Sequence, residues 1–509
     1  MGRPCGKETI MTIRRLQAML LLACGLATMG CDGTADDPTV PARFRQFAQA
    51  VEQERQTLGA PGIAVAVVEQ GVVTFAHGFG QKDARRPDPV LPTTLFRIGS
   101  CTKMLTAVAL LQTVQQGLVS LDEPITTHVP AFHLTKTPAA VAEVKVRHLL
   151  THSGGLWDYG ETNAPADEQT DAALEQFVTG RFADLDYVAT PPGAVWAYAN
   201  PDYMIAGLIA EKALATPYRT LMHDRVLEPL GMQRTFFLPS EVLADGDYAV
   251  GDNCHDTSQT RCFDSSIPAV VEPDSYDNPW GRPAGFAWSS VLDLAQVARF
   301  LVRGEPDVLD NELWSAMVSP QMPTKTVGDL IWYGFGVFVS EGIGGSLVLP
   351  YRTLRTVSHG GDIAGFAADI LCIPSLDQCI VALANSTGAH LQNSLAVAVK
   401  TLAELPPATT PPDVAPKPER YPLYAGSYND AFGVGQVSVT TSNGKLYLHI
   451  PSLDASGTPY DPELAPTTVD NFAFTVSAQA LPLTFIADAT GTYTYGRSRP
   501  YVAIRTSGP

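Results

Sequence analysis

Basic residues are scarce in this sequence. Its 509 residues contain 34 Lys and Arg against 52 Asp and Glu, which gives a formal net charge of −18. So acidic a chain repels phosphate backbones, and no Lys/Arg-rich run offsets the repulsion, so we expect no nucleic-acid partner. The same charge argues against direct attraction to anionic lipid head groups.

Long internal apolar runs are also lacking. Beyond the N-terminus, no apolar run reaches the roughly 18 residues that a transmembrane helix needs. Hydrophobic residues make up 45% of the chain and charged residues only 17%, so a packed core is expected. The length exceeds that of one ordinary compact domain and predicts two or three.

The N-terminus has the pattern of an export signal. Arg14 and Arg15 precede an apolar stretch, 16–29, that ends in Gly30-Cys31. A Cys directly after a small residue resembles the lipobox of bacterial lipoproteins and predicts lipidation of Cys31. Cys24 is an alternative lipidation site, and an ordinary cleaved signal with an incidental Cys is another reading. We therefore predict an exported, lipid-anchored protein of the periplasm or cell envelope, with no other contact with the membrane.

Four further cysteines form two closely spaced pairs. Cys254 and Cys262 flank a polar loop, and Cys372 and Cys379 flank a turn between two apolar runs. In an oxidising compartment, each pair predicts a local disulfide. A zinc site of Cys254, His255 and Cys262 is the alternative for the first pair, although no fourth ligand lies nearby.

Periodic apolar patterns predict an α+β domain over residues 41–404. Helices are expected over 41–59, 100–116 and 391–405. Strands are expected over 63–69, 72–78, 331–339, 347–350, 367–373 and 379–384. Because strands lie near both ends of this region and helices dominate its middle, we expect one sheet built from both chain ends.

A proline-rich connection separates this domain from the C-terminal part. Residues 405–418 carry six prolines in fourteen positions, which indicates a stiff linker. Residues 419–509 contain period-2 runs, and Ser442-Asn443-Gly444 predicts a hairpin, so we expect a small all-β domain, either a sandwich or a barrel. A signal peptide over 1–31 and a polar tether over 32–40 complete the organisation. The pattern does not set an oligomeric state.

The first chemical motif is Ser100-Cys101-Thr102-Lys103. Residues three apart share one face of a helix, so the Ser100 hydroxyl and the Lys103 amine would lie within one turn. A serine hydroxyl is a weak nucleophile until a base takes its proton, and a buried Lys with a lowered pKa is such a base. Ser442 and Lys445 repeat the spacing, but in the predicted hairpin turn no helix aligns them.

The second motif is Tyr198-Ala199-Asn200. A tyrosine near a cationic Lys can relay a proton, and an Asn can hold a substrate amide. Tyr276-Asp277-Asn278 repeats this spacing, but in an Asp- and Pro-rich loop without flanking regular structure.

The third motif is His359-Gly360-Gly361-Asp362, directly before a strand pattern. Two glycines would let a substrate approach the backbone closely and leave N–H groups to bind an oxyanion. The alternative is that His359 simply packs beside the strand.

Together the three motifs, in the order Ser100, Tyr198, His359, resemble the serine β-lactamase and penicillin-binding-protein superfamily. The resemblance is to its class C-like branch of esterases and D-amino-acid peptidases, and it covers 41–404. The flanking segment 149–156 and Gly365-Phe366 add to it. The resemblance implies an antiparallel sheet flanked by helices, with a helical subdomain.

The resemblance also implies roles for the motif residues. Ser100 would be the acylated nucleophile, Lys103 and Tyr198 would share proton transfer, and Asn200 would orient the substrate. The backbone N–H groups of Ser100 and Asp362 would hold the oxyanion. No metal or cofactor is implied.

The function implied is that of an exported serine hydrolase that acts through an acyl-enzyme on small-molecule or peptide esters and amides. A β-lactamase is one alternative, and a non-catalytic penicillin-binding-like envelope protein is another. His359 stands where relatives usually have a Lys that attracts a substrate carboxylate. A mostly neutral His weakens this attraction at pH 7, and we expect the imidazole to charge as the pH falls toward ~6.

Overall fold

The computed structural model describes residues 38–158, 170–253, 267–344, 349–499 and 501–508. The predicted signal peptide with Cys24 and Cys31, most of the tether, and the Cys254–Cys262 pair with its zinc alternative lie outside these residues. Within the described part of the chain, no helix has the length and apolar character required to cross a membrane.

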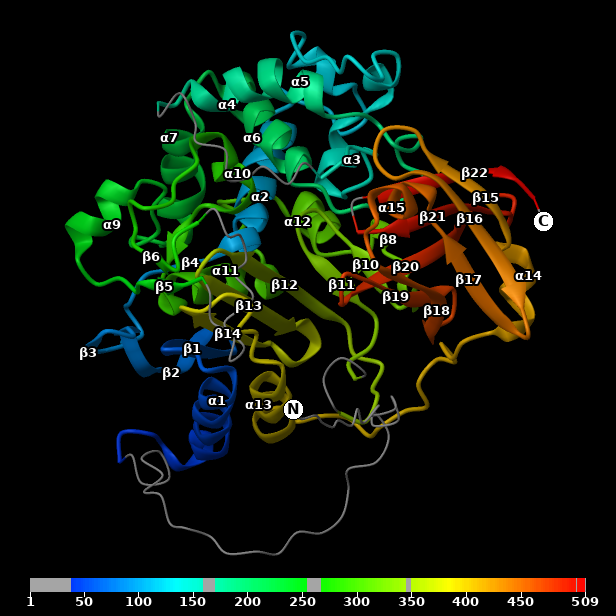
Figure 1. Cartoon of the computed structure of the whole chain (residues 1–509). Helices are drawn as coiled ribbons and strands as arrows, with labels where there is room; N and C mark the ends of the chain where they lie inside the picture. The colour runs from blue at the N-terminus through cyan, green and yellow to red at the C-terminus, as the bar shows by residue number, and fades with distance from the viewer. Residues whose placement is uncertain (1–37, 159–169, 254–266, 345–348, 500, 509) are drawn as a thin grey trace, which may run out of the picture.

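A nine-stranded antiparallel sheet forms the centre of the described structure (Figure 1). In spatial order its strands are β3 (Arg86–Pro89), β2 (Val72–Asp83), β1 (Gly62–Glu69), β14 (Gln378–Ala384), β13 (Phe366–Ile373), β12 (Thr356–Ile363), β11 (Phe338–Ser340), β10 (Ile331–Tyr333) and β8 (Met322–Pro323). At its middle, Ile63 of β1 pairs with Ala384 of β14, so the sheet joins both ends of the domain as predicted. Both central strands are apolar runs because helices cover both faces.

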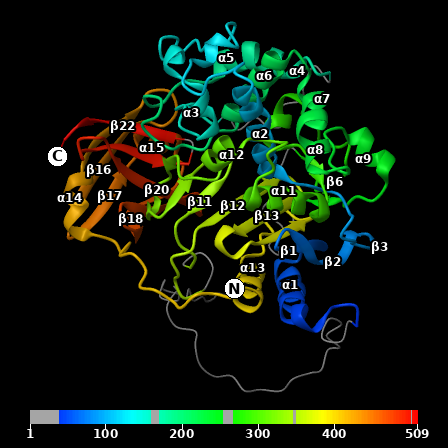
Figure 2. The same ribbon diagram turned by 180° about the vertical axis from the view of Figure 1, so that it is seen from behind.

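Of the helices described up to residue 402, two cover one face of this sheet and the others lie on the other side (Figures 1 and 2). On the first face, α1 (Arg45–Leu58) packs against α13 (Gln392–Leu402), and the apolar side of α1 is buried. The other face is covered by α11 (Val291–Arg303). Beyond α11 lie α2 (Thr102–Gln115), α3 (Val146–Leu150), α4 (Ala173–Gln176), α5 (Phe182–Leu185), α6 (Asn200–Leu214), α7 (Tyr218–Met222), α8 (Glu228–Leu230), α9 (Pro239–Asp245), α10 (Arg282–Gly285) and α12 (Asn311–Met317).

Short strands complete this part of the protein, which we call the body (residues 38–402 as described). They are β4 (Phe96–Arg97), β5 (Gly251–Asp252), β6 (Val270–Val271), β7 (Trp288–Ser289) and β9 (Thr326–Asp329). After α13, residues 403–417 contain neither helix nor strand and lead around the outside of the body to the C-terminal part (Figure 1).

The C-terminal part is a closed barrel and not a sandwich, the other all-β form that the sequence allows. Its strands are β15 (Gly426–Asp430), β16 (Gly435–Ser442), β17 (Lys445–His449), β18 (Tyr460–Thr468), β19 (Asn471–Val476), β20 (Gln479–Ala487), β21 (Tyr493–Ser498) and β22 (Tyr501–Ser507), with α14 (Tyr421–Tyr424) and α15 (Pro451–Ser456) beside them. Because the barrel is closed, no edge of this sheet is left unpaired. A small apolar core fills the barrel.

Two strand predictions differ from the structure, and one strand was not predicted. The run 331–339 is not one strand but a hairpin of β10 and β11, because Gly336, with φ +81°, lets the chain turn back. Of 347–350, the described positions 349 and 350 are not in a strand. The motif His359–Asp362 directly precedes the strand β13, as expected, and itself lies inside β12, a strand that was not predicted because two glycines interrupt its pattern.

Candidate active site

Ser100 lies in a tight turn, η2 (Gly99–Cys101), that leads directly into α2. This turn packs on β12 so closely that only glycine fits at two positions. A Cβ on Gly361 would lie 2.0 Å from Ile98 O, and a Cβ on Gly99 would lie 2.8 Å from Asp362 N. Gly99 also has φ +49°, in the left-handed region that favours glycine. The turn therefore holds the backbone of Ser100 beside that of Asp362.

Lys103 is fully buried one helical turn after Ser100. Its Nζ lies 3.0 Å from Ser100 Oγ, 2.7 Å from Asn200 Oδ1 and 2.6 Å from Ala284 O. Burial disfavours the ammonium form and lowers the pKa of Lys103 to about 7, although Asp158 opposes the shift. Near neutral pH the amine is thus half uncharged and within hydrogen-bond distance of the hydroxyl.

Tyr198 and Asn200 come from the segment that enters α6. The Tyr198 phenol interacts with the Ser100 hydroxyl, and the Lys103 Nζ lies 4.9 Å from the centre of its ring. Burial raises the pKa of Tyr198, so the phenol keeps its proton at neutral pH. The structure therefore brings Ser100, Lys103, Tyr198 and Asn200 into contact with one another.

A further carboxyl group, Asp158, adjoins these residues. Its Oδ1 accepts hydrogen bonds from the backbone N of Asn200 at 2.9 Å and from its Nδ2 at 3.1 Å. Burial raises the pKa of Asp158, although the Asn200 bonds and the charge of Lys103 act against this. The sequence analysis missed Asp158, because no local motif marks an Asp that is 42 residues away from its partner.

A buried pair supports this segment from behind. His152 Nδ1 lies 3.0 Å from Asp202 Oδ2 and 3.2 Å from the backbone N of Ala199. The centre of the His152 ring lies 4.2 Å from that of the Tyr198 ring, and the two rings are tilted by 39°. Burial holds the pKa of His152 well below its usual range, so the ring is neutral and positions Tyr198 by packing and hydrogen bonding.

His359 is only 3% exposed and faces inward. Its Nε2 lies 3.0 Å from the Tyr333 hydroxyl and its Nδ1 lies 2.6 Å from Gly360 O. Burial and the neighbouring charge of Lys103 lower the pKa of His359 to about 3. The expectation that this imidazole charges near pH 6 is therefore wrong, because water does not reach it to solvate a cation.

Gly360 and Asp362 point away from Gly361, as alternate residues of a strand must. A Cβ on Gly360 would face His390, at 3.6 Å. The Asp362 carboxylate lies 2.9 Å from His390 Nε2, and Asp369 Oδ1 lies 2.9 Å from His390 Nδ1. The side chain of Asp362 is thus anchored behind the sheet, while its backbone N lies beside η2.

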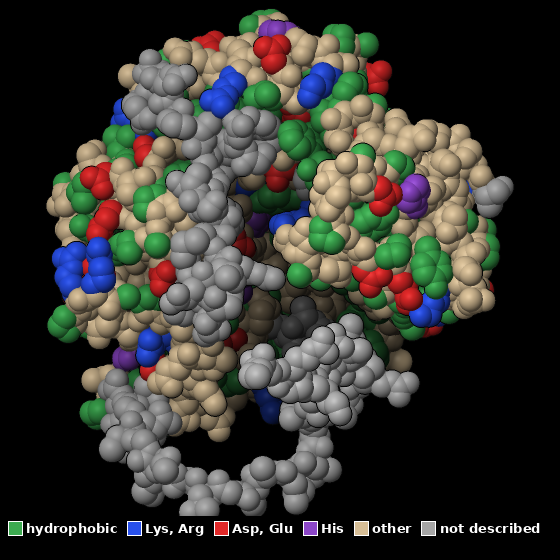
Figure 3. Space-filling model, viewed as in Figure 1, with side chains coloured by type: hydrophobic (Ala, Val, Ile, Leu, Met, Phe, Trp, Pro, Cys, Tyr) green, Lys and Arg blue, Asp and Glu red, His purple; other side chains and the backbone are tan. Residues whose placement is uncertain are grey.

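A cavity of about 980 Å³ opens beside this site, between the body and the barrel. Tyr198, Asp158 and Trp196 line it from the body, and Phe472 and Arg499 are among the barrel residues in its wall. The space-filling view shows a hollow between the two parts (Figure 3). The barrel therefore completes the wall of the pocket next to Tyr198.

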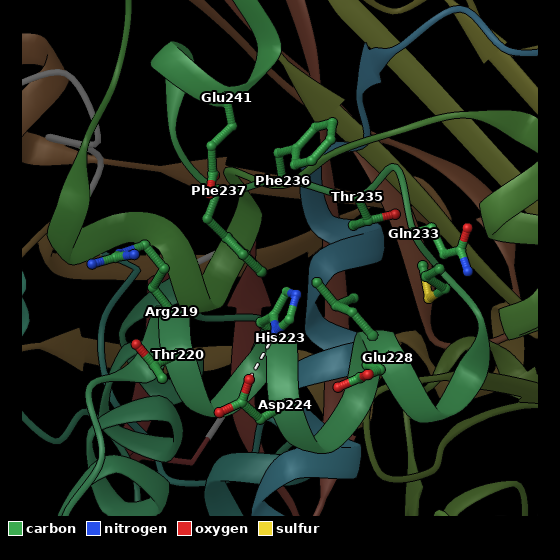
Figure 4. A pocket seen from close by; sticks show the side chains of 12 residues that line it. Arg219, Thr220, His223, Asp224, Glu228, Gln233, Thr235, Phe236, Phe237 and Glu241 are labelled. Atoms are coloured by element: carbon green, nitrogen blue, oxygen red, sulfur yellow. Dashed lines mark hydrogen bonds and ion pairs between the residues drawn. The ribbon is translucent and has the colours of Figure 1, made fainter. Parts of the chain in front are cut away.

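A second cavity, of about 490 Å³, shares no lining residue with the first (Figure 4). Three side chains that bind metals in other proteins, His223, Asp224 and Glu228, lie at it within 4.8 Å of one another. All three are exposed, and His223 Nδ1 already contacts Asp224 Oδ1 at 2.7 Å. Solvated groups of this kind are common on protein surfaces and indicate no site by themselves.

The two decoy motifs lie elsewhere. Ser442 ends β16 and Lys445 begins β17 on an exposed hairpin of the barrel, where Lys445 pairs with Glu463. The backbone carbonyl of Tyr276 accepts a hydrogen bond from Arg97, outside the Ser100 site. Helix context, not spacing, thus separates the Ser100 motif from its repeat.

The model of the family described as Beta-lactamase matches residues 47–403. The chain is 25% identical over 349 residues to "Protein flp" of Staphylococcus aureus strain MW2, which is 67% of this chain and 63% of that protein. It is 26% identical over 348 residues to "Unguisins hydrolase ungD'" of Aspergillus campestris, again 67% of this chain and 62% of the relative. The match thus spans less than two thirds of these relatives' length.

Two solved structures share the fold of about nine tenths of the chain, and a third shares the fold of about seven tenths. SurE superposes with a TM-score of 0.63 at 22% identity, covering 91% of this chain and 99% of SurE. The octameric penicillin-binding protein homologue from Pyrococcus abyssi gives 0.58 at 22% identity, covering 90% and 99%. D-amino acid amidase from Ochrobactrum anthropi gives 0.57 at 23% identity, covering 71% and 99%.

Proposed function

The chain belongs to the Beta-lactamase family, and on that premise we propose that it is a serine hydrolase that cleaves esters or amides through an acyl-enzyme on Ser100. One observation carries the proposal. The Lys103 amine lies 3.0 Å from Ser100 Oγ, and burial lowers its pKa to about 7. A nucleophile and a base able to take its proton are therefore in contact at neutral pH.

In the acylation step, neutral Lys103 accepts the proton of Ser100 as Oγ attacks the substrate carbonyl. The negative charge that develops on the carbonyl oxygen lies between the N–H groups of Ser100 and Asp362, which are held together by η2 and β12. Fixed donors of this kind cost no reorganisation during the reaction.

Loss of the leaving group needs a proton, and Tyr198 is placed to deliver it. Its phenol is protonated because burial raises its pKa, and it lies beside both Ser100 and Lys103. The proton taken up by Lys103 replaces the one that the phenol gives up. Water then attacks the acyl-enzyme, Lys103 takes a proton from this water, and the proton passes to Ser100 Oγ as its bond to the acyl carbon breaks.

The substrate class we favour is an amide or ester of a D-amino acid or D-peptide. Solved relatives include a D-amino acid amidase and SurE with D-Leu. β-Lactam hydrolysis is the second candidate. It is less favoured because His359, where relatives carry a cationic Lys, is buried and uncharged.

We further propose that the protein is exported and lipid-anchored at Cys31, with local disulfides at Cys254–Cys262 and Cys372–Cys379. Export, the lipid anchor and the Cys254–Cys262 disulfide rest on sequence patterns. The Cys372–Cys379 disulfide is supported by the sheet, in which the two residues lie directly opposite each other across β13 and β14, with Cα atoms 4.0 Å apart. Mass spectrometry of the mature N-terminal peptide, with Cys24→Ser and Cys31→Ser variants, would identify the lipidated residue.

The activity is tested by labelling. Fluorophosphonate, fluorescent penicillin and short-chain aryl esters are offered to the purified protein, and the modified peptide is identified by mass spectrometry. Ser100→Ala should abolish labelling and ester turnover, whereas Ser442→Ala, at the matching position of the decoy motif, should retain both. Modification of Ser442, or turnover that survives in Ser100→Ala, would contradict the proposal.

A further inference from the structure

Both parts of the chain supply charged groups to the cavity beside the site. Among its described lining residues, Asp158 comes from the body, and Arg497 and Arg499 come from the barrel. Arg497 is buried, and its Nη1 donates to the backbone carbonyls of Trp196 at 2.6 Å and Thr324 at 2.8 Å. Its Nη1 therefore attaches the barrel to the body, and its Nη2 donates to Thr484 Oγ1 within the barrel at 3.2 Å.

Arg499, in contrast, is an exposed cation with no partner among the described residues. No described carboxylate lies within 4.0 Å of its guanidinium, and it donates no hydrogen bond to a described group. It follows β21 in a left-handed conformation, with φ +52°. Glycine, Asn or Asp takes this conformation more readily than a long side chain does, so the turn presents Arg499 at a backbone cost.

The surroundings of Arg499 are those of a ligand pocket. Aromatic side chains from both parts of the chain, among them Trp157, Trp196 and Tyr501, line the cavity. Its volume of about 980 Å³ is ample for a drug-sized or short peptide ligand. The positive charge of Arg499 is near enough to oppose, weakly, the rise in pKa that burial causes in Asp158, which binds Asn200 at the proposed catalytic site.

We infer that Arg499 is a specificity-determining residue that binds a carboxylate of the substrate, while an apolar part of the same molecule lies against the aromatic wall. His359 does not offer this charge, because it is buried and is not among the described residues that line the cavity. The inference rests on the proposed function in placing the substrate in this cavity. The substrate class it specifies is an ester or amide with a free carboxylate, such as a peptide with its C-terminus.

The test compares matched substrates that differ only in charge. In one pair the carboxylate or carboxamide is on the leaving group, and 3-(butyryloxy)benzoate is compared with 3-(butyryloxy)benzamide. In the other pair it is on the acyl group, and the phenyl monoester of adipic acid is compared with its terminal amide. For at least one pair, Arg499→Gln should lower the ratio of kcat/KM for carboxylate over carboxamide about tenfold.

Two further variants separate charge from structure. Arg499→Lys keeps the cation and should retain part of the preference. Lys445→Gln removes one exposed positive charge from the same barrel, outside the cavity, and should leave the ratio unchanged. An equal fall in Lys445→Gln would mean that the net charge of the protein, rather than Arg499, sets the preference.

A binding measurement keeps the inference independent of turnover. Calorimetric titration of Ser100→Ala with each probe should give a Kd about tenfold lower for one carboxylate than for its carboxamide, and adding Arg499→Gln should remove the difference. Arg499-dependent binding without any turnover in the unmutated protein would refute the proposed hydrolase but support the inference. If neither binding nor turnover depends on Arg499, the inference is wrong.

Discussion

At the scale of single residues, the charge of Lys103 sets the pH dependence of the proposed reaction. Its pKa is about 7 because burial disfavours the ammonium, and only the neutral amine accepts the proton of Ser100. We expect kcat/KM for a neutral ester to rise through pH 7, to be about tenfold below its plateau at pH 6, and to level off above pH 8.

The matched variant is Lys103→Arg, whose guanidinium stays charged over this range. It should be nearly inactive at every pH. An unmutated enzyme whose kcat/KM is flat between about pH 5.5 and 8 would mean that Lys103 is not the base.

The sequence predicts the residues of the site better than their charge states. Ser100, Lys103, Tyr198 and Asn200 follow from motifs, because helical spacing is a local property. The pKa of His359, about 3, depends on burial by residues distant in the chain, so the expected charging near pH 6 is wrong. Asp158 and His390 carry no motif, because their partners come from other elements.

At the scale of elements, the close contact between η2 and β12 positions the two backbone N–H groups that we propose bind the oxyanion. A methyl group on Gly361 would lie 2.0 Å from Ile98 O and 3.2 Å from Ser100 N. Gly361→Ala should therefore separate turn and strand and slow fluorophosphonate labelling of Ser100 about hundredfold, as misplacement by about 1 Å does in enzymes.

The neighbouring glycine provides the control. A methyl group on Gly360 would meet its nearest atom, in His390, at an ordinary 3.6 Å. Gly360→Ala should thus be labelled at nearly the unmutated rate, and circular dichroism should show both variants folded. Equal labelling of both variants would show that the contact does not position Ser100.

His390, which precedes α13, ties β12 to β13 through Asp362 and Asp369. Burial opposes its charge, but the two carboxylates outweigh burial and raise its pKa to about 10. A pKa raised by folding stabilises the native state fully below the unfolded value of ~6.5, and this stabilisation is lost as the pH rises through 10.

We therefore expect His390→Gln to reduce the free energy of unfolding most at pH 6, less at pH 8 and little above pH 10. Urea unfolding at each pH measures the difference. His449→Gln, which breaks a surface pair with Asp454, serves as control and should show a small effect throughout. A loss in His390→Gln that does not vary with pH would exclude linkage to this charge.

Elements with strong local patterns match their predictions closely, and those without do not. β1, β13 and β14 each begin one residue before their predicted start and end at the predicted residue. The strand β12 was missed because two glycines interrupt its apolar alternation, although pairing with β13 fixes it in the fold. Short-range patterning therefore fails where tertiary contacts decide the conformation.

At the scale of the whole molecule, the sequence predicts two parts and a proline-rich connection but not their contact. Val195 and Ala197 form one apolar cluster with Ile486, Tyr495 and Val502 of the barrel. These residues lie about three hundred positions apart, and nothing in either segment specifies the other. The cavity at this contact was therefore beyond prediction from local patterns.

Arg497 adds polar contacts to the attachment of the barrel beside the site. Only 4% of it is exposed, its Nη1 donates to two backbone carbonyls of the body, and its guanidinium carbon lies 5.1 Å from the centre of the Trp196 ring. Arg497→Ala would leave both carbonyls without their donor, at a cost of about 1–3 kcal/mol for each. This cost should loosen the barrel but leave the Ser100–Lys103 contact, which lies wholly within the body, intact.

We therefore expect Arg497→Ala to speed thermolysin cleavage within residues 403–417 about tenfold or more, because this segment, although already exposed, is tied to the barrel at Val414 and gains freedom when the contact opens. Fluorophosphonate should still label Ser100, but the preference for carboxylate substrates should fall, because Arg499 follows Arg497 by two residues and would no longer be held at the cavity. Lys445→Ala, on the exposed face of the barrel, should change none of the three measurements. If cleavage accelerates while the carboxylate preference stays intact, the barrel is not needed to present Arg499 to the substrate.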